Sequence, residues 1–360
     1  MAHIVVIFVA ALVLSWWLHP WMARRAAHWG LMDHPDGLRK LHGLTTPTVG
    51  GLAMFLAWGL TLPWMGLPLH EPRYWTLLVA LFPLVGVGLW DDRRGLRVRY
   101  RFLVQFSGAL LLVVVGGVSV HHLGDLVGLG PLGLGGFHGL FSVLCVVGVI
   151  NAVNMIDGMD GLSGTLVLVA LVASALAAGR AGATDLVFMA VSLIAVLLPF
   201  LYFNSRLLRP RATLFMGDAG SMGFGLILAW FMVELTQRPG AIQTPATALW
   251  LLAVPLIDMF SAFFRRILAG AGPFSPDRKH LHHFLLHRGH GVNGALLRLL
   301  GAAVIGAGVA LLAPAWQGHE PVLFLGLVIV WLGYLGYSER YWRLARKVQG
   351  DGRSPSEDRW

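Results

Sequence analysis

The stretch LVFMAVSLIAVLLPFLYF, residues 186–203, contains no charged residue and is followed at once by NSRLLRPR, residues 204–211. A helix rises about 1.5 Å per residue, so roughly 20 apolar residues cover the roughly 30 Å of hydrocarbon in a bilayer. Three arginines directly after such a run are typical of the cytoplasmic side of a span. This one segment therefore predicts a membrane-spanning helix and the direction in which it crosses.

Apolar runs of the same kind recur along the whole chain of 360 residues. The sequence is 56% hydrophobic and 12% charged, with a mean hydropathy of +0.69, whereas about 25% of residues are charged in a typical soluble protein. This composition predicts an all-α, polytopic integral membrane protein with about eleven transmembrane helices, with an error of one either way. The runs are residues 5–18, 48–69, 75–90, 103–120, 137–156, 162–178, 186–203, 220–233, 246–257, 299–315 and 322–337.

The basic residues divide unequally between the two sides of the membrane. Of 27 Lys and Arg residues, only Arg73, Arg180 and Arg238 follow even-numbered runs, which leaves 24 on the other side. By the positive-inside rule the N-terminus is outside, in the periplasm, and the C-terminus is cytoplasmic. The net charge of +9 is spread over short loops, which favours contact with the membrane lipid bilayer and not with nucleic acid. We expect one transmembrane domain over residues 1–340 and a basic cytoplasmic tail over residues 341–360.

Paired acids close the third run, in LWDDRRGLRVRYR, residues 89–101. Asp91 and Asp92 lie where the apolar residues end, with five arginines, the last of them Arg101, within ten positions. Solvated interfacial charge is the alternative, but acids at a membrane boundary are usually retained for function. Mg²⁺ takes oxygen ligands, commonly one or two carboxylates plus substrate phosphates, so the segment favours a joint metal and phosphate site.

A second polar segment, NAVNMIDGMDGL, closes the fifth run at residues 151–162. Asn151, Asn154 and Asp157 are spaced i, i+3 and i+6, so they are expected to share one face of a helix. The glycines that follow break the helix and allow backbone to approach a ligand. A merely polar turn is the alternative, but so many carboxylate and amide groups between two spans favour contact with water or a ligand.

The eighth run opens with LFMGDAGSMGFG, residues 214–225. Asp218 lies at the expected helix start, where glycines expose backbone N–H groups that favour anions. An Asp at this position is also a common N-cap, which is the structural alternative. Phe215 is either lipid-facing bulk or a flat surface on which a base could stack.

Two further loops carry cations on the basic side. Lys40 and His42, in MDHPDGLRKLHGLTTPTVGG, residues 32–51, form either an interfacial anchor or an anion site. The loop AGPFSPDRKHLHHFLLHRGH, residues 271–290, is long for this chain, and long ordered loops are commonly functional. It has no nearby Cys and no HExxH, so phosphate and sugar hydroxyls are favoured over zinc as its ligands. Its cationic candidates are Arg278, His280, His282 and His283.

Asp258 lies inside the ninth run, seven residues before Arg265. An acid inside a membrane span is a functional candidate, and partnership with the arginine is the structural alternative. The single cysteine, Cys145, excludes an intramolecular disulfide and is expected to pack inside a span.

Taken together, these segments resemble the polyprenyl-phosphate N-acetylhexosamine-1-phosphate transferases, the glycosyltransferase 4 family. KLHGLTTPTVGG, WDDRRGL, NAVNMIDGMDGL, FMGDAGS and PFSPDRKHLHH occur in the family's order and at membrane boundaries, from about Lys40 to the last run. The chain looks most like the branch that transfers GlcNAc-1-phosphate from UDP-GlcNAc to undecaprenyl phosphate and releases UMP. That branch works at the cytoplasmic face of the bacterial inner membrane with Mg²⁺, or Mn²⁺ in its place, and starts an envelope polysaccharide such as O-antigen.

The resemblance also implies roles for individual residues. Asn154 and Asp218 would hold Mg²⁺ on the nucleotide pyrophosphate, and Phe215 would stack on uracil. The catalytic candidates are Asp91, Asp92, Asp157 and Asp160, of which Asp160 would lie near the base. The substrate-binding candidates are Lys40, His42, Arg101, Asn151, Phe215, Arg278, His280, His282 and His283.

Several alternatives stay open. Another UDP-amino sugar, or UDP-MurNAc-pentapeptide, could be the donor, because sugar choice depends on the shape of the loop at residues 271–290. A proton-coupled transporter would place acids at mid-membrane and show an inverted repeat, whereas these acids gather at one boundary. A homodimer, and the choice between one displacement and an aspartyl-phosphate intermediate, are also left open.

Overall fold

The computed structural model describes residues 2–34, 45–241, 243–270, 272, 279–316 and 318–350, which are mostly helical. The predicted ligands Lys40, His42 and Arg278 lie outside these residues. The only strands within them are β1 (Met32–Asp33) and β2 (Thr46–Pro47), an antiparallel pair. The helices are α1 (Ala2–Trp29), α2 (Gly50–Thr61), α3 (Pro72–Arg94), α4 (Val98–Leu110), α5 (His138–Ile156), α6 (Leu162–Arg180), α7 (Thr184–Asn204), α8 (Gly217–Gln237), α9 (Pro245–Leu251), α10 (Ala253–Leu268), α11 (Leu281–His287), α12 (Val292–Leu312) and α13 (His319–Gly350), with short turns of 3-10 or π helix η1 (Leu62–Trp64), η2 (Leu111–Val115), η3 (Gly135–Phe137) and η4 (Ala313–Ala315).

The predicted all-α membrane fold is confirmed. In the described part of the chain, nine helices are long and apolar enough to cross a membrane, and ten if α9 and α10 form one broken span. The shorter apolar segment Gly50–Trp64 corresponds to the second predicted run. Helix α13 continues to Gly350, across the domain boundary expected at residue 340, and residues 351–360 lie outside the description.

The ninth predicted run is divided between two helices in the structure. Helices α9 and α10 meet at Leu252 with a bend of 87°. A continuous helix would press the ring of Pro255 against the carbonyl of Leu251 four positions earlier, whereas a new helix accepts proline in its first turn. Leu252 accordingly leaves the helical conformation, with φ −114° and ψ 20°.

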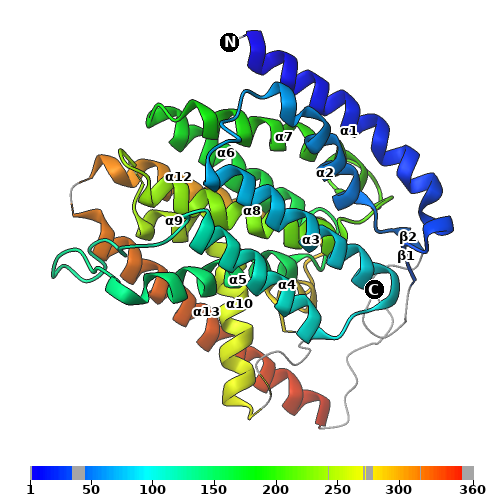
Figure 1. Cartoon of the computed structure of the whole chain (residues 1–360). Coiled ribbons are helices and arrows are strands. Elements are labelled where there is room, and N and C mark those ends of the chain that lie inside the picture. The colour runs from blue at the N-terminus through cyan, green and yellow to red at the C-terminus, as the bar shows by residue number, and fades with distance from the viewer. Residues whose placement is uncertain are drawn as a thin grey trace.

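Helix α8 lies at the centre of the bundle, between α3 and α5 (Figure 1). Its most apolar window is entirely buried, whereas that of α1 is only 28% buried. Glycines allow neighbouring backbones to reach its first turns. A Cβ added at Gly51 of α2 would lie 2.2 Å from the nitrogen of Gly220, and one at Gly88 of α3 would lie 2.3 Å from the nitrogen of Ala219. Such small-residue contacts are typical of membrane helices and hold the start of α8 in place.

The end of the bundle away from the paired acids carries its own ion pairs. Arg73, at the start of α3, contacts Glu234, near the end of α8, at 3.1 Å. Arg238 contacts Asp185 at 2.7 Å, and the Tyr74 hydroxyl also donates to Asp185. Glu234 is therefore buried next to a cation. These groups link α3, α7 and α8 at the sparsely basic end of the bundle.

Candidate functional site

Four helix ends bring polar side chains to one point, which we call the acid cluster: Asp91, Asp92, Arg101, Asn154 and Asp218. Arg101, in the first turn of α4, lies at its centre. Its Nη1 is 2.7 Å from Asp91 Oδ2 and 3.2 Å from Asp218 Oδ2. Its Nη2 donates to Asn154 Oδ1 at 2.6 Å. One guanidinium therefore joins the ends of α3 and α5 to the start of α8.

Asn154 completes the link between α5 and α8. Its Nδ2 donates to Asp218 Oδ1 at 2.7 Å and to the hydroxyl of Ser221 at 2.9 Å. The Asp218 side chain thus faces Arg101 and Asn154 and does not cap its own helix, whose N-cap residue is Met216. Ser221 was not predicted as a site residue, although its position three residues after Asp218 places it on the same helical face.

The Asp92 carboxylate supplies the missing cap from another helix. Its Oδ1 accepts from the backbone N–H of Asp218 at 3.0 Å. A negative charge here is favoured by the partial positive charge of the α8 N-terminus. Gly217 has φ +72°, and a Cβ on it would lie 2.5 Å from Asp92 Oδ2, so only glycine fits this turn.

The second oxygen of Asp92 is buried and has no hydrogen-bond partner among the described residues. A buried carboxylate oxygen without a donor is costly unless a proton or a cation faces it. This oxygen belongs to the same cluster as the carboxylates that Arg101 contacts. The cluster therefore has more acceptor capacity than its one arginine uses.

Asp157 and Asp160 lie beside this cluster but outside its hydrogen bonds. Asp157 directly follows α5, and burial, reinforced by the charges of Asp218 and Asp160, raises its pKa to about 7. Asp160 Oδ2 accepts from Arg206 Nε at 2.6 Å, so it holds the loop between α7 and α8. The two acids are therefore in different environments: Asp157 is half-buried near like charges, and Asp160 is paired with Arg206.

Phe215 lies three residues before Asp218 in a turn held by backbone hydrogen bonds. Its N–H donates to the carbonyl of Pro47 at 2.7 Å, and its carbonyl accepts from Gly50 at 3.0 Å. The side chain is half-buried. Phe215 thus lies just before the start of α8, in the turn that leads to Asp218.

Asn151 faces the interior of the bundle. Its Nδ2 donates to Gln105 Oε1 at 2.7 Å, one turn later in α4 and one turn earlier in α5 than the Arg101–Asn154 pair. Asn151 and Asn154 therefore share the helical face that contacts α4, as their spacing predicted. Asn151 itself lies apart from the acid cluster.

The expected loop at residues 271–290 contains a helix, α11, which corrects the prediction for its second half. His280 Nδ1 lies 2.8 Å from Asp258 Oδ2. His280 is thus a partner of Asp258, and Arg265 Nη2 donates to the Lys279 carbonyl at 2.7 Å. An α10 side chain is thus tied to the His-rich segment.

His282 joins this segment to the loop after α5. It is 1% exposed, and a Cβ added at Gly158 would lie 2.5 Å from its Nε2. Burial, together with the neighbouring His283, lowers the pKa of His282 to about 3, so the ring is neutral at physiological pH. Its ring centroid is 4.2 Å from that of His283. Neither ring nitrogen of His282 has a hydrogen-bond partner in the part of the chain that the structure describes.

A divalent cation fits the acid cluster only if substrate completes its coordination. Across the described residues, no three His, Cys, Asp or Glu side chains are placed to hold one metal ion together. However, Asp91, Asp218 and Asn154 present oxygens to the same guanidinium. Mg²⁺ commonly takes one or two carboxylates and fills its other positions with water and phosphate oxygens. The donor set therefore suits Mg²⁺ better than a metal that needs an all-protein cage.

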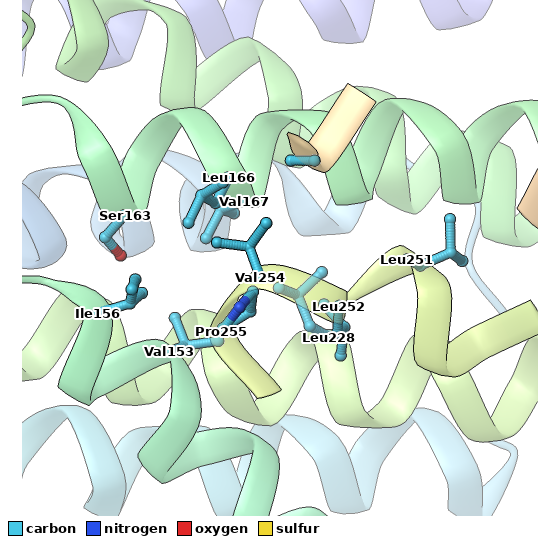
Figure 2. A pocket seen from close by; sticks show the side chains of 11 residues that line it. Val153, Ile156, Ser163, Leu166, Val167, Leu228, Leu251, Leu252, Val254 and Pro255 are labelled. Carbon is cyan, nitrogen blue, oxygen red and sulfur yellow. The ribbon is translucent and has the colours of Figure 1, made fainter. Parts of the chain in front are cut away.

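A small apolar cavity of about 10 Å³ lies at the bend between α9 and α10 (Figure 2). Val153 of α5, Val167 of α6, Leu228 of α8 and Pro255 of α10 are among its walls. Ser163 is its only polar lining side chain. A cavity of this volume holds at most about one water molecule, so it is a packing gap between the helices and too small for a substrate.

Comparison with known proteins gives consistent matches. The glycosyl transferase family 4 pattern matches residues 74–236, the region from α3 to α8. A Haemophilus influenzae protein is 33% identical over 91% of this chain and 92% of its own length. A Pasteurella multocida protein is 36% identical over 89% of both chains, and one of Escherichia coli K12 is 33% identical over 89% of this chain and 87% of its own length. All three are named undecaprenyl-phosphate alpha-N-acetylglucosaminyl 1-phosphate transferase.

Proposed function

The chain belongs to glycosyl transferase family 4, and we propose that it transfers GlcNAc-1-phosphate from UDP-GlcNAc to undecaprenyl phosphate, releasing UMP. One observation carries this proposal beyond the similarity itself. The segments that resemble the family come from distant parts of the chain, yet Asp91, Arg101, Asn154 and Asp218 contact one another directly.

The reaction joins two anions. An oxygen of the lipid phosphate attacks the sugar-linked phosphorus of UDP-GlcNAc and forms a new P–O bond. The bond from that phosphorus to the bridging oxygen breaks, and UMP leaves with that oxygen and its electron pair. A phosphate monoester has a second pKa near 6, so the attacking phosphate is largely dianionic at about pH 7. No side chain has to remove a proton from it.

The main task of the site is therefore to neutralise charge and align the two phosphates. Arg101 is the cation at the centre of the acid cluster, and we propose that it neutralises phosphate oxygens when the substrates bind. We propose that Asp218 and Asn154, with Asp91 or Asp92, hold a Mg²⁺ ion. When bound, this ion would supply positive charge to the pyrophosphate oxygens.

Residues around the cluster are proposed to bind the UDP-sugar. Phe215 would stack on uracil beside the start of α8. Asp160 would lie close to the same part of the nucleotide. His282 lies against the loop after α5, and its ring contacts that of His283. Both rings would contact the sugar or its phosphate.

The acid cluster is proposed to face the cytoplasm of the bacterial inner membrane. Arginine-rich segments join the end of α3 to the start of α4 and lead into α8, and basic loops are retained on the cytoplasmic side. UDP-sugars are soluble and polar, whereas the lipid phosphate lies at the membrane surface. A site at the end of the bundle suits both substrates.

The test is an assay of purified protein in detergent with undecaprenyl phosphate and a panel of UDP-GlcNAc, other UDP-amino sugars and UDP-MurNAc-pentapeptide. We expect UMP and lipid-linked GlcNAc to form in equal amounts from UDP-GlcNAc, to stop with EDTA and to return with added Mg²⁺. Activity with a different sugar would correct the donor. An absence of UMP with every donor would overturn the transferase proposal.

A further inference from the structure

Asp258 is a fully buried acid in α10 that the proposed chemistry does not use. Both of its carboxylate oxygens have partners in the His-rich segment. Oδ2 lies 2.8 Å from His280 Nδ1, and Oδ1 accepts from the backbone N–H of Leu281 at 2.7 Å. The acid therefore holds both the ring of His280 and the first residue of α11.

Arg265 makes a second connection from the same helix. It lies seven residues after Asp258, which places the two side chains on one face of α10. Its Nη2 donates to the carbonyl of Lys279 at 2.7 Å. One face of α10, the helix that follows the bend at Leu252, thus holds the three consecutive residues 279–281.

The contact with Asp258 also selects the form of the His280 ring. An ionised carboxylate only accepts hydrogen bonds, so the imidazole hydrogen lies on Nδ1. Nε2 is then the ring atom that can meet a ligand, as an acceptor in the neutral ring. A carboxylate behind a functional histidine commonly fixes the ring's tautomer and orientation.

The histidine so held stacks on the next one. The rings of His280 and His282 have centroids 5.8 Å apart and planes within 4° of each other. His282 in turn lies against Gly158, in the loop that follows Asn154 and Asp157. Asp258 is therefore connected, through two stacked rings, to the loop beside the acid cluster.

We propose that Asp258 is a positioning residue for the transfer reaction, which acts through His280 and does not itself touch substrate. This rests on the proposed transferase function. The carboxylate orients His280 Nε2 toward the donor's sugar phosphate and fixes the start of α11. Arg265 supports it by holding the preceding carbonyl.

Two substitutions of His280 separate positioning from simple stabilisation. In His280→Asn the amide NH₂ takes the place of Nδ1–H and can still donate to Asp258, but nothing replaces Nε2. In His280→Gln the amide reaches the place of Nε2, and the donor to Asp258 is lost. Both variants leave Asp258 unchanged.

We expect His280→Asn to keep the wild-type Tm and to lower kcat by roughly 10- to 100-fold, the size of effect seen when the partners of functional histidines are removed. Asp258→Asn should lower kcat by a similar factor without changing the KM for undecaprenyl phosphate. Because both changes act on one interaction, the double variant Asp258→Asn/His280→Asn should be no slower than the slower single variant.

Ser261→Ala is the matched control, because it removes a buried hydroxyl one turn along α10 that has no partner among the described residues. It should leave kcat unchanged. A wild-type kcat for His280→Asn would show that the Asp258–His280 pair is only structural. The same conclusion would follow if the fold-decrease in kcat of the double variant equalled the product of the two single decreases. The wild type is assayed first for UMP release, so a failure of the transferase proposal is recognised separately. If Asp258→Asn does not fold, the kcat of His280→Asn still decides the question.

Discussion

The backbone N–H of Asp218 donates a 3.0 Å hydrogen bond to the carboxylate of Asp92. This bond crosses from the first turn of α8 to the last turns of α3, at the point where the two backbones also meet through Gly88 and Ala219. The preceding residue, Asp91, contacts Arg101 instead. Neighbouring acids in one motif thus have different partners: Asp92 fixes the start of α8, and Asp91 neutralises the central cation.

Asp218→Asn should abolish most Mg²⁺-dependent UMP release. The substitution keeps the size of the side chain and its contact with Asn154, but removes the charge that faces Arg101. We expect kcat to fall by at least about 100-fold, as when a preorganised electrostatic group is removed. UMP formation in detergent measures the effect, and elution volume together with Tm reports whether the variant is folded.

Glu234→Gln is a matched control at the other end of the same helix. It weakens the contact with Arg73, so it should lower Tm while leaving kcat within about twofold of wild type. Full activity of Asp218→Asn would remove Asp218 from the metal site.

Phe215→Ala should raise the KM for the UDP-sugar and leave the KM for undecaprenyl phosphate unchanged. Stacking on an aromatic ring is worth about 1–3 kcal/mol per base, so the expected increase is roughly 5- to 150-fold. Initial-rate kinetics with each substrate varied in turn measure it. Phe215→Trp keeps a flat ring and should restore most of the affinity. An unchanged nucleotide KM in the alanine variant would argue against stacking.

The sequence was sufficient for the membrane fold and for the composition of the acid cluster. Apolar runs predict spans because only helices satisfy their own backbone groups in lipid. Motifs at the ends of alternate spans must lie on one side of the membrane, so Asp91, Asn154 and Asp218 were expected near one another. Their contact through Arg101 confirms that they meet.

The bend at Leu252 could not be predicted, because proline alone does not decide it. Pro20, Pro83 and Pro199 lie inside continuous helices, whereas Pro255 follows a break. Surrounding packing decides which of these positions tolerates a lost hydrogen bond.

Contacts between segments that are distant in the sequence could not be predicted either. Asp258 and His280 are 22 positions apart and separated by a helix end, so no spacing rule joins them. The spacing grouped Asn151 with Asn154. Asn151 instead donates a hydrogen bond to Gln105 of α4, which is buried inside the bundle. Side-chain partners across helices depend on tertiary packing, which a single sequence does not show.

Asp157→Asn should stabilise the protein more at pH 8 than at pH 4.5. The folded-state pKa of Asp157 is raised from its usual 3.8 to about 7. Between these values the folded protein retains a proton that the unfolded chain loses, so this group's contribution to stability falls as pH rises through that window. The asparagine variant has no carboxyl at this position and lacks the effect. We therefore expect the difference in Tm between the variant and the wild type to grow by about 5 °C or more from pH 4.5 to pH 8.

Thermal unfolding of both proteins at the two pH values, in EDTA, tests this. EDTA is needed because a bound divalent cation would favour the ionised carboxyl. An advantage that is equal at both pH values would mean that Asp157 titrates normally.

Cysteine labelling should place the acid-cluster end of the bundle in the cytoplasm. In a Cys145→Ser background, Thr213→Cys marks the loop that leads into α8, and Leu129→Cys marks the loop before α5 at the opposite end. We expect a membrane-impermeant maleimide to modify residue 129, which is 91% exposed, in intact spheroplasts, and to reach residue 213 only after lysis. The reverse pattern would place the cluster in the periplasm, away from cytoplasmic UDP-sugars, and would contradict the proposed reaction.

Replacing both His282 and His283 by Ala should strongly lower kcat without removing a bound metal. The pKa of His282 is lowered to about 3, so its ring is neutral and can act only as a hydrogen-bonding group at physiological pH. We therefore expect kcat to fall by roughly 100-fold, and the residual activity of the single variant His282→Gln, which keeps an amide near Nε2, to exceed that of His282→Ala. Metal analysis of the purified wild type should show less than stoichiometric zinc, and the double variant should respond to Mg²⁺ at the same concentration as wild type. One equivalent of zinc in the wild type, lost in the double variant, would instead make these histidines metal ligands.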